Sequence, residues 1–407
     1  MNQILTNRQI QLWRLSIYFI FALPGFAFAS WVSRTPAIRD VLDATTGQMG
    51  WIIFGLAAGS MLGLFSASHL IAHKGGRFAI MTGLASCTIG LVIIGAGGLW
   101  LPSSVLVFSG LAVFGFGNGL SDVAMNVEGT AVERAAGKSL LTGFHAAYSL
   151  GTLVGAMAGV ASIKTGISTP VHMIIVSAVI LLSVPYLYRL IPSGTGKEAG
   201  GNTTEPPMNA RERMAVWKEK RTILIGIIVL GMAFAEGAAN DWLPLIMVDG
   251  YHVSPAAGSF AFGLFVAAMT ICRALGGLFL ERFGRVAVLR ASSILAVAGL
   301  LLVIIGHSYE VAIVGIVLWG CGAAFGFPVG LSAAGDDPRK LAARVGAVST
   351  AGYVAFLVGP PLLGVIGEYI GLLNALIVVL IAVIAAGFLS QAARPLGKQD
   401  HMKQERE

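Results

Sequence analysis

The sequence predicts an all-helical membrane protein with twelve transmembrane helices arranged as two pseudo-symmetric six-helix halves. Of its 407 residues, 56% are hydrophobic and only 12% are charged, against about 25% charged in an average soluble protein. One bilayer-spanning helix needs about 20 apolar residues, so twelve helices would use about 240 positions, close to the whole hydrophobic content. This composition excludes compact soluble enzymes, nucleic-acid binders, disordered tails and secreted disulfide scaffolds.

Apolar runs of spanning length occur twelve times along the chain. The short alternating segments of a membrane β-barrel do not occur, and lipid cannot satisfy exposed backbone groups, so only helices fit these runs. The predicted spans cover residues 13–33, 47–70, 78–100, 103–127, 140–163, 170–190, 222–248, 256–280, 286–307, 310–334, 342–369 and 371–393.

The basic residues predict the orientation. With the N-terminus in the cytoplasm, all but four of the 27 Lys and Arg residues fall in inner loops or termini. Arg34, Arg39 and Lys164 fall on the other side, and Arg273 lies inside a helix. The positive-inside rule therefore places both termini in the cytoplasm. The formal net charge of +7 reflects topology, and no nucleic-acid partner is expected.

A hydrophilic segment, residues 191–221, divides the chain. It predicts an N-terminal six-helix bundle over 1–190, a cytoplasmic linker over 191–221, and a C-terminal bundle with a short tail over 222–407. The halves are weakly similar to each other, because a shift of 208 residues places Gly76-Arg77 on Gly284-Arg285. Duplicated helical halves are typical of transporters, which bind substrate between the repeats near the bilayer midplane.

The basic turn after the eighth predicted helix carries the most specific motif. Residues 277–285 read Gly-Leu-Phe-Leu-Glu-Arg-Phe-Gly-Arg, which resembles the loop motif of the major facilitator superfamily, Gly-x-x-x-acid-Arg-x-Gly-Arg. The copy after the second helix, residues 73–77, lacks the acid and the leading glycine. The resemblance implies a gating role for the matching residues. These are Gly277, Glu281, Arg282, Gly284, Arg285, Lys74, Gly76 and Arg77.

Within the superfamily, the chain resembles uncharacterised bacterial inner-membrane members distantly similar to fucose–proton symporters. This narrower resemblance rests on residues 34–39, 236–242 and 352–361. Drug–proton antiporters of the superfamily carry Arg-rich and Gly-Pro motifs in helices 4 and 5. Here helix 4 has no Arg and helix 5 has no proline, which disfavours multidrug efflux.

An ionisable group inside a membrane helix costs about 2.5–3.5 kcal/mol and therefore indicates a function. Glu236 lies about midway along the seventh predicted helix, with Asn240 one turn later and Asp241 beside it. One interpretation is a proton acceptor that faces the central cavity. The alternative is a structural carboxyl, protonated or hydrogen-bonded to a neighbouring helix, with Asp241 solvated near the outer end.

Helix 4 carries a polar stripe of Asn118, Asp122 and Asn126, four residues apart. The resemblance implies that helices 1, 4, 7 and 10 line the cavity, where this stripe would contact substrate or proton. Alternatively, it joins helices as a polar seam. Glu128 is expected at the interface, paired with Arg134 or with a base of the second loop.

Arg273 is the single basic residue predicted well inside a helix. It could neutralise Glu236, anchor an anionic substrate, pair with Asp122, or extend its side chain toward the cytoplasm. His145 and Tyr148 are three residues apart and share a face of helix 5, where they could relay protons or pack. Glycines at spacings of four in helices 2 and 5 predict close packing. Pro24, Pro244, Pro328 and the pair Pro360-Pro361 predict locally loosened helices.

No metal-ligand spacing, phosphate loop or nucleophile triad appears, so neither an enzyme nor a metal or other cofactor is expected. Without an ATP site, concentrative transport must use an ion gradient. The predicted function is a secondary active transporter working by alternating access, proton-coupled, for a small polar solute such as a sugar-like compound. Its expected partners are that solute, protons and the bilayer, and the chain is expected to be a monomer. The alternatives are proton-driven efflux of an amphipathic compound, and a non-transporting receptor or scaffold.

Overall fold

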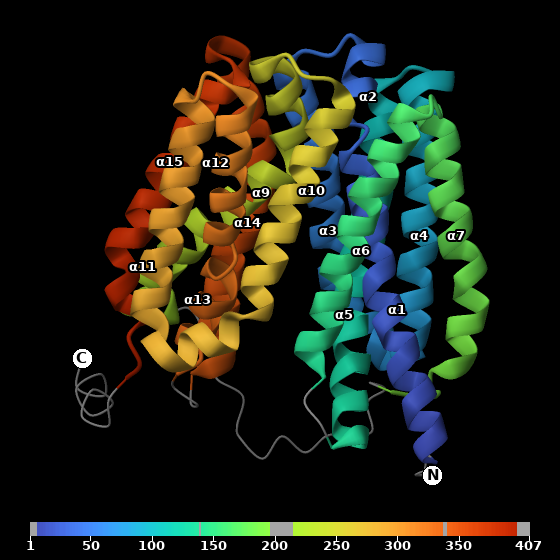
Figure 1. Ribbon diagram of the computed structural model, residues 1–407. Helices are drawn as coiled ribbons and strands as arrows, with labels where there is room; N and C mark the ends of the chain where they lie inside the picture. Colours follow the sequence, from blue (N-terminus) through green and yellow to red (C-terminus); the bar gives the residue numbers. More distant parts are fainter. Residues whose placement is uncertain (1–5, 138–139, 196–214, 337–339, 397–407) are drawn as a thin grey trace. The chain divides into compact units, whose positions relative to one another are not determined.

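The computed structural model describes residues 6–137, 140–195, 215–336 and 340–396. All regular structure in these residues is helical (Figure 1). Within them, twelve segments are long and apolar enough to cross a membrane, which confirms the predicted fold class. The helices are α1 (Asn7–Val32), α2 (Thr35–Leu42), α3 (Thr46–Lys74), α4 (Gly76–Gly95), the π-helical η1 (Ala96–Trp100), α5 (Ser104–Ala136), α6 (Leu141–Lys164), α7 (Thr169–Leu190), α9 (Lys220–Tyr251), α10 (Pro255–Ala274), α11 (Gly276–Ile305), α12 (Tyr309–Ala323), α13 (Gly326–Ala334), α14 (Leu341–Ile370), α15 (Leu372–Leu389) and the 3-10 helix η2 (Ser390–Ala393).

Side-chain caps fix where several helices begin. Thr6 and Gln9 form a reciprocal capping box at the start of α1, and Thr45 and Gln48 form another at α3. These contacts satisfy backbone N–H groups that have no partner inside the helix. The predicted second helix therefore begins at Thr46, one residue from its expected start.

Glycines with positive φ break the chain at the two copies of the basic motif. Gly75 has φ 90° between α3 and α4, and Gly284 has φ 74° inside α11. Only glycine adopts such a backbone without strain. α10 ends at Ala274 and α11 begins at Gly276, just before the motif. The motif residues 277–283 therefore lie in the first turns of α11 and not in a loop. The expected eighth span, 256–280, is interrupted there.

Packing divides the chain into two compact units. Unit 1 comprises residues 1–201, 241–266 and 360–372, and unit 2 comprises residues 202–240, 267–359 and 373–407. Parts of α9, α10 and α14 therefore pack with the N-terminal helices. The division into residues 1–190 and 222–407 stays a prediction, and residues 196–214 of the linker lie outside the described residues.

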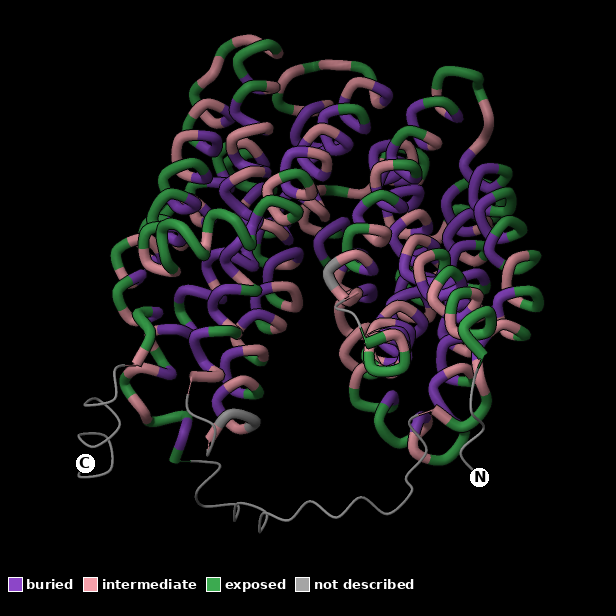
Figure 2. The backbone as a smooth tube through the Cα atoms, turned by 60° about the horizontal axis from the view of Figure 1, so that its bottom comes forward, coloured by how far each residue is buried: buried purple, intermediate pink, exposed green. Residues whose placement is uncertain are grey.

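Close helix contacts in unit 1 occur at the predicted glycines. A Cβ atom on Gly59 of α3 would overlap the carbonyl group of Ala112 in α5, and one on Gly151 of α6 would overlap that of Ala22 in α1. Buried positions recur along these helices where they face their neighbours (Figure 2). The glycine spacings predicted close packing, and this prediction is confirmed.

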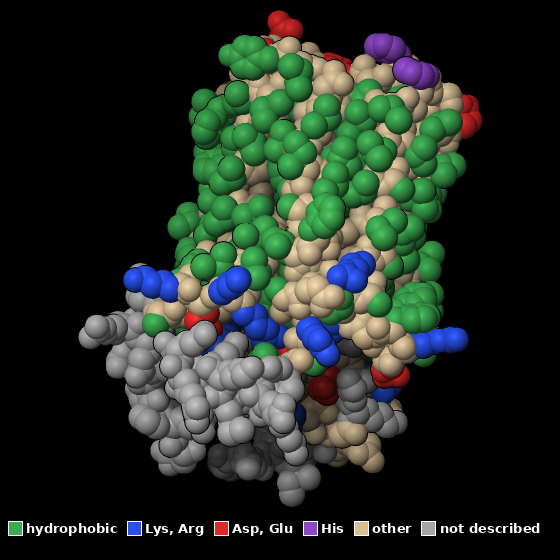
Figure 3. Space-filling view, turned by 90° about the vertical axis from the view of Figure 1, so that its left-hand side faces the viewer, with side chains coloured by type: hydrophobic (Ala, Val, Ile, Leu, Met, Phe, Trp, Pro, Cys, Tyr) green, Lys and Arg blue, Asp and Glu red, His purple; other side chains and the backbone are tan. Residues whose placement is uncertain are grey.

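Unit 2 packs in the same manner. A Cβ on Gly315 of α12 would lie 2.7 Å from the carbonyl oxygen of Gly299 in α11, and one on Gly387 of α15 would lie 2.9 Å from the Cβ of Ser293. Outward residues such as Ile294 and Phe388 are 68% and 84% exposed, as expected for a lipid-facing surface. Figure 3 shows Lys and Arg gathered along one edge of this hydrophobic surface. We call that end of each unit, where the basic motifs lie, its basic end.

Candidate functional site

A largely buried ion pair lies in the middle of unit 2. Glu236 is about midway along α9, and Arg273 lies in the last turn of α10. The Nη2 atom of Arg273 donates to Oε2 of Glu236 at 2.7 Å. The Glu236 side chain is 14% exposed and that of Arg273 is 33% exposed. The structure therefore shows that Arg273 neutralises Glu236, which is one of the roles considered for it. The prediction that Arg273 lies well inside a longer helix was wrong, because α10 ends one residue later.

The guanidinium of Arg273 is also held by an interrupted helix. The tenth span was predicted as continuous over 310–334, but α12 ends at Ala323 and α13 begins at Gly326. Pro328 has no N–H, so it cannot donate to the carbonyl oxygen four residues earlier, on Ala324. Nε of Arg273 donates to that oxygen at 3.0 Å. Arg273 thus supplies the hydrogen-bond donor that the backbone N–H of a residue other than proline would provide at position 328.

These contacts fix the guanidinium plane at mid-span. Two of its three nitrogens are bound to Glu236 and to Ala324, and the remaining one, Nη1, makes no hydrogen bond to any described residue. The side chain therefore does not extend toward the helix end, as the snorkelling alternative required. Broken helices whose freed backbone groups face polar partners near the midplane are a recurring feature of transporter binding sites.

Asn240 and Asp241 follow Glu236 on α9. Both are partly buried, and neither forms a hydrogen bond with the Glu236–Arg273 pair in the described structure. Asp241 packs in unit 1, whereas Asn240 belongs to unit 2. Of the residues predicted in this region, Glu236 and Arg273 are hydrogen-bonded to each other in the described structure. Asn240 and Asp241 remain candidate site residues because of their positions on α9.

A second polar group joins α5 and α6 in unit 1. The Nδ2 atom of Asn126 donates to the carbonyl oxygen of Asp122 at 2.8 Å, and Oδ1 of Asn126 lies 3.1 Å from Nε2 of His145. Because an amide oxygen only accepts, this geometry places the proton of His145 on Nε2. Phe21 of α1 packs edge-on against the imidazole at 5.2 Å.

The predicted polar stripe is thus partly assembled. The structure connects Asp122, Asn126 and His145, while Asn118 forms no hydrogen bond with them in the described part of the chain. Tyr148 lies on the same face of α6 as His145, three residues later. A carboxyl, an amide and an imidazole in sequence can hold or pass a proton, and they can also join two helices.

At the basic end of unit 2, the motif forms a charge cluster. Nη1 of Arg285 pairs with Asp336 at 2.6 Å, and Nη2 of Arg221 pairs with the same carboxylate at 2.7 Å. Glu281 and Arg282 are exposed, and the guanidinium carbon of Arg282 lies 5.4 Å from the centroid of the Phe283 ring. The motif therefore links the kink of α11 to the end of α13.

The copy of the motif in unit 1 packs differently. The guanidinium of Arg77 lies 4.6 Å from the ring centroid of Tyr188, and Lys74 ends α3. A Cβ on Gly76 would lie 2.6 Å from Oε1 of Glu128. Glu128 is 0% exposed and lies within the helix packing beside the second loop, and its place at the membrane interface stays a prediction. Of the bases considered as its partner, Arg77 of the second loop is the one whose charge acts on the Glu128 carboxylate.

The burial of Glu128 was not predicted from the sequence, although a signal existed. The shift of 208 residues that aligns the two motifs also places Glu128 on Asp336 and Trp13 on Arg221. Trp13 faces Glu128 in unit 1, as Arg221 faces Asp336 in unit 2. The two carboxylates thus match each other under this shift, but Asp336 is bonded to two arginines, whereas Glu128 is buried beside an indole.

Glu219 forms a second cluster at the basic end of unit 2, just before α9. Its carboxylate accepts from Nε of Arg344 at 2.6 Å and from Nζ of Lys340 at 2.8 Å. Burial opposes ionisation, but the hydrogen bonds and charges of Arg344 and Lys340 outweigh it and hold the pKa of Glu219 below its ordinary value. These contacts attach the segment before α9 to α14.

This lowered pKa predicts an acid-dependent loss of stability. A carboxyl whose pKa is lower in the folded state stabilises the fold above its unfolded pKa, and this contribution is lost as the pH falls through the folded value. We expect the wild-type melting temperature to fall between about pH 5 and pH 3, and Glu219→Gln to be less stable at neutral pH with a shallower acid decline. Thermal unfolding across pH checks this, with exposed Glu310→Gln as the control. Equal acid slopes for Glu219→Gln and wild type would contradict it.

Unit 1 carries polar contacts at the end opposite its basic end, and their pairing was not predicted. Arg39 of α2 forms an ion pair with Asp249 of α9, and the backbone N–H of Gly47 donates to Oε2 of Glu368 at 2.9 Å. Gly50 and Gly364 approach so closely that a Cβ on Gly364 would lie 2.9 Å from the Cα of Gly50. The ends of α9 and α14 are thereby fixed to α2 and α3.

Arg34, at the start of α2, is 5% exposed. Its Nε donates to Nδ1 of His172 at 3.0 Å and its Nη2 to the carbonyl oxygen of Ile167 at 2.9 Å. Burial lowers the pKa of Arg34 to about 10, so it remains charged at neutral pH. The residue therefore attaches the start of α2 to the start of α7.

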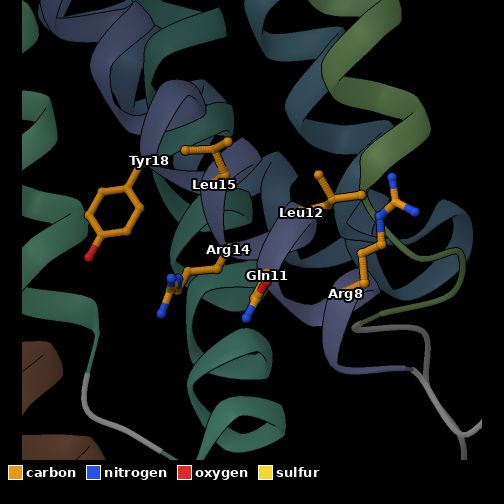
Figure 4. A pocket seen from close by; sticks show the side chains of 6 residues that line it. All are labelled: Arg8, Gln11, Leu12, Arg14, Leu15 and Tyr18. Atoms are coloured by element: carbon orange, nitrogen blue, oxygen red, sulfur yellow. The ribbon is translucent and has the colours of Figure 1, made fainter.

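A pocket of about 600 Å³ lies on α1 in unit 1. Its lining side chains splay around this one helix and do not converge on a point (Figure 4). It contains none of the predicted site residues. It is lined by Arg8, Gln11, Leu12, Arg14, Leu15 and Tyr18. We therefore base the candidate site on the Glu236–Arg273 pair and not on this depression.

Comparison with known proteins gives a consistent family. Residues 225–406 match the family model described as Major Facilitator Superfamily. An uncharacterized MFS-type transporter of Yersinia pestis is 27% identical over 87% of this chain and 89% of its own length. An uncharacterized transporter of Sinorhizobium fredii is 29% identical over 89% of this chain and 96% of its own.

Solved structures share the fold. A mutant form of the nucleoside transporter NupG superposes with a TM-score of 0.74 at 15% identity, over 94% of this chain and 99% of its own. A bacterial homolog of the human lysosomal transporter Spinster gives 0.72 at 14% identity, over 96% and 98%. A variant of the E. coli fucose:proton symporter FucP gives 0.57 at 14% identity, over 94% and 100%. The resemblance predicted from the loop motif is confirmed, and these comparisons indicate a transporter rather than an enzyme.

Proposed function

We propose that this transporter of the Major Facilitator Superfamily is a secondary active transporter that moves a small polar solute by alternating access and couples that movement to protons at Glu236. One observation carries the proposal: a Glu–Arg pair lies at mid-span and is attached to an interrupted helix. Charged groups at this depth are costly, so their presence there requires a function or a partner. Arg273 is the one cation bonded to Glu236 in the described structure, and protonation of Glu236 would release it.

The second support is the arrangement at the Arg39–Asp249 end of unit 1. There, backbone approach at Gly50 and Gly364 and the Arg39–Asp249 pair hold the ends of α9 and α14 against the N-terminal helices. A transporter with alternating access must release and re-form such contacts once in each cycle. The Arg39–Asp249 pair can be released without unfolding a helix, because ion pairs near the surface contribute only about 1 kcal/mol or less.

Charge reversal tests this role of the Arg39–Asp249 pair. Arg39→Asp or Asp249→Arg is expected to open this end more often, by about fivefold, because like charges replace the pair. The measurement is the maleimide labelling rate of Ser33→Cys, a buried position whose carbonyl oxygen accepts a hydrogen bond from Ser259 of α10, in a background without the native cysteines. The double reversal should restore slow labelling, and Asp43→Asn, at an exposed residue that caps the end of α2, is the control. Unchanged labelling in both single variants would rule out this role.

Reconstitution tests the proposed function itself. Purified protein in liposomes should accumulate at least one solute of a small polar panel when a proton gradient is imposed, and should only equilibrate it without a gradient. Ligand-induced thermal stabilisation selects the panel. Accumulation on a sodium gradient alone would overturn proton coupling. Equal uptake with and without either gradient would indicate facilitated diffusion.

We further propose that the protein is a monomer in the bacterial inner membrane with both termini in the cytoplasm. The clustering of Lys and Arg at one end supports this orientation by the positive-inside rule (Figure 3). A cysteine placed in the 191–221 segment should resist an impermeant maleimide in intact cells and react after lysis. Reaction in intact cells would reverse the orientation.

A further inference from the structure

The guanidinium of Arg273 presents an unused edge. Nε is bound to the carbonyl oxygen of Ala324 and one N–H of Nη2 to Glu236, which leaves the two N–H groups of Nη1 and one of Nη2 without partners among the described residues. The Arg273 side chain is 33% exposed and the Glu236 side chain is 14% exposed. The accessible member of the pair is therefore the cation, and its orientation is already fixed by two hydrogen bonds.

Charge balance determines when this edge can bind an anion. While Glu236 is ionised, it compensates the arginine and repels a second negative group. When Glu236 takes up a proton, the guanidinium charge remains at mid-span with no counter-ion, which is unfavourable. An anionic solute that reached the free edge would restore neutrality through charge-assisted, bidentate hydrogen bonds. A cationic solute would meet the arginine first and be repelled.

From this geometry we infer that Arg273 binds a carboxylate group of the solute, and that the solute anion replaces the Glu236 carboxylate as the partner of Arg273 when Glu236 is protonated. This inference rests on the proposed function and specifies its substrate class as small organic carboxylates. Proton and anion then bind together, because each removes the charge imbalance that the other creates. Their joint uptake is electrically neutral for a monocarboxylate.

The titratable groups on the helices around the pair are few within the described residues. Cys272 precedes Arg273 on α10, and Cys321 lies in the last turn of α12, with its thiol in contact with that of Cys272. On α9, Asp241 follows Glu236 by five residues, and on α14 the ring of Tyr353 packs on Phe327. Among these groups, Glu236 alone is bonded to Arg273, so we assign the proton-linked exchange to it.

Matched ligand pairs test the inference without a known substrate. Each pair contains a carboxylate and its neutral counterpart: glucuronate with glucose, lactate with propane-1,2-diol, and benzoate with benzyl alcohol. Thermal stabilisation of purified protein is measured at pH 5.5 and pH 8 for wild type, Glu236→Gln and the double variant Glu236→Gln/Arg273→Gln. The double variant avoids an unpaired buried charge, and the exposed Arg394→Gln is the matched control.

At least one carboxylate should stabilise wild type more at pH 5.5 than at pH 8, and its neutral counterpart should bind about tenfold more weakly. Glu236→Gln should bind that carboxylate equally at both pH values, because its amide resembles the protonated acid. The double variant should lose the preference for the carboxylate, and Arg394→Gln should keep it.

Two results would overturn the inference. They are equal stabilisation by the carboxylate and its neutral counterpart in wild type, and a preference for the carboxylate that survives in the double variant. Proton-driven accumulation of a neutral solute alone would also overturn it, while leaving the proposed function intact. The proposed function itself fails if no solute accumulates on a proton gradient, and its assignment of coupling to Glu236 fails if Glu236→Gln still accumulates solute.

Discussion

Glu236→Gln is expected to abolish concentrative uptake while downhill movement of the same solute continues. Glutamine is close to glutamate in size and shape and resembles its protonated form, so the local packing is preserved, but it cannot exchange a proton. In liposomes with an imposed proton gradient, the wild-type protein should accumulate the solute, and the variant should stop at equal concentrations inside and outside.

The control for this result is Glu310→Gln. It makes the same chemical change at an exposed residue in the first turn of α12, far along that helix from the end near Arg273. It should accumulate solute as wild type does. Full gradient-driven accumulation by Glu236→Gln would show that the coupling proton binds elsewhere, with Asp122 and His145 the next groups to test.

Arg273→Ala is expected to lower stability more than any other single change at the site. It removes the cation that compensates Glu236 and the donor that binds the carbonyl oxygen of Ala324. Breaking a buried pair by removing one partner costs about 3 kcal/mol or more, because an uncompensated charge remains. Thermal unfolding of the purified protein in detergent should show a melting temperature several degrees lower.

The double variant Glu236→Gln/Arg273→Gln separates the two causes of this loss. If the stranded carboxylate dominates, the double variant should recover most of the stability that Arg273→Ala loses. Arg282→Ala, at an exposed arginine of the same unit, should change stability by about 0.5 kcal/mol or less. A melting temperature for Arg273→Ala equal to that of Arg282→Ala would mean that the pair does not stabilise the fold.

Much of the fold could be predicted from the sequence, because each membrane helix must satisfy its own backbone and bury or expose about 20 apolar residues. The twelve spans and the family resemblance followed from this local information. Helix ends were less predictable, since they depend on single residues such as Gly75 and Gly284, whose positive φ values place the turns.

The interruption of the tenth span could be predicted in part from the sequence, but its contact with Arg273 could not. Pro328 predicted a loosened helix, and its missing N–H does leave the oxygen of Ala324 free for another donor. That Arg273, 51 residues away in the chain, would bind that oxygen could not be read from sequence. The link between Glu236 and Arg273 was one of several alternatives until the packing of α9 and α10 selected it.

Contacts between distant segments were the least predictable. Arg39 and Asp249 are 210 residues apart in the chain, and nothing in the sequence around either residue indicates the other as its partner. Glu128 was expected at the interface because only its neighbours in sequence were considered. Its burial follows from the close approach of Gly76, which places a backbone where a side chain would otherwise stand.

The central claim, that solute and proton move together through Glu236, is tested most directly by recording the pH outside weakly buffered proteoliposomes as solute is added. We predict external alkalinisation during downhill solute entry in the wild-type protein, and no pH change in Glu236→Gln at a comparable solute flux. Solute entry into wild-type proteoliposomes with no pH change, or an equal alkalinisation in Glu236→Gln, would contradict it.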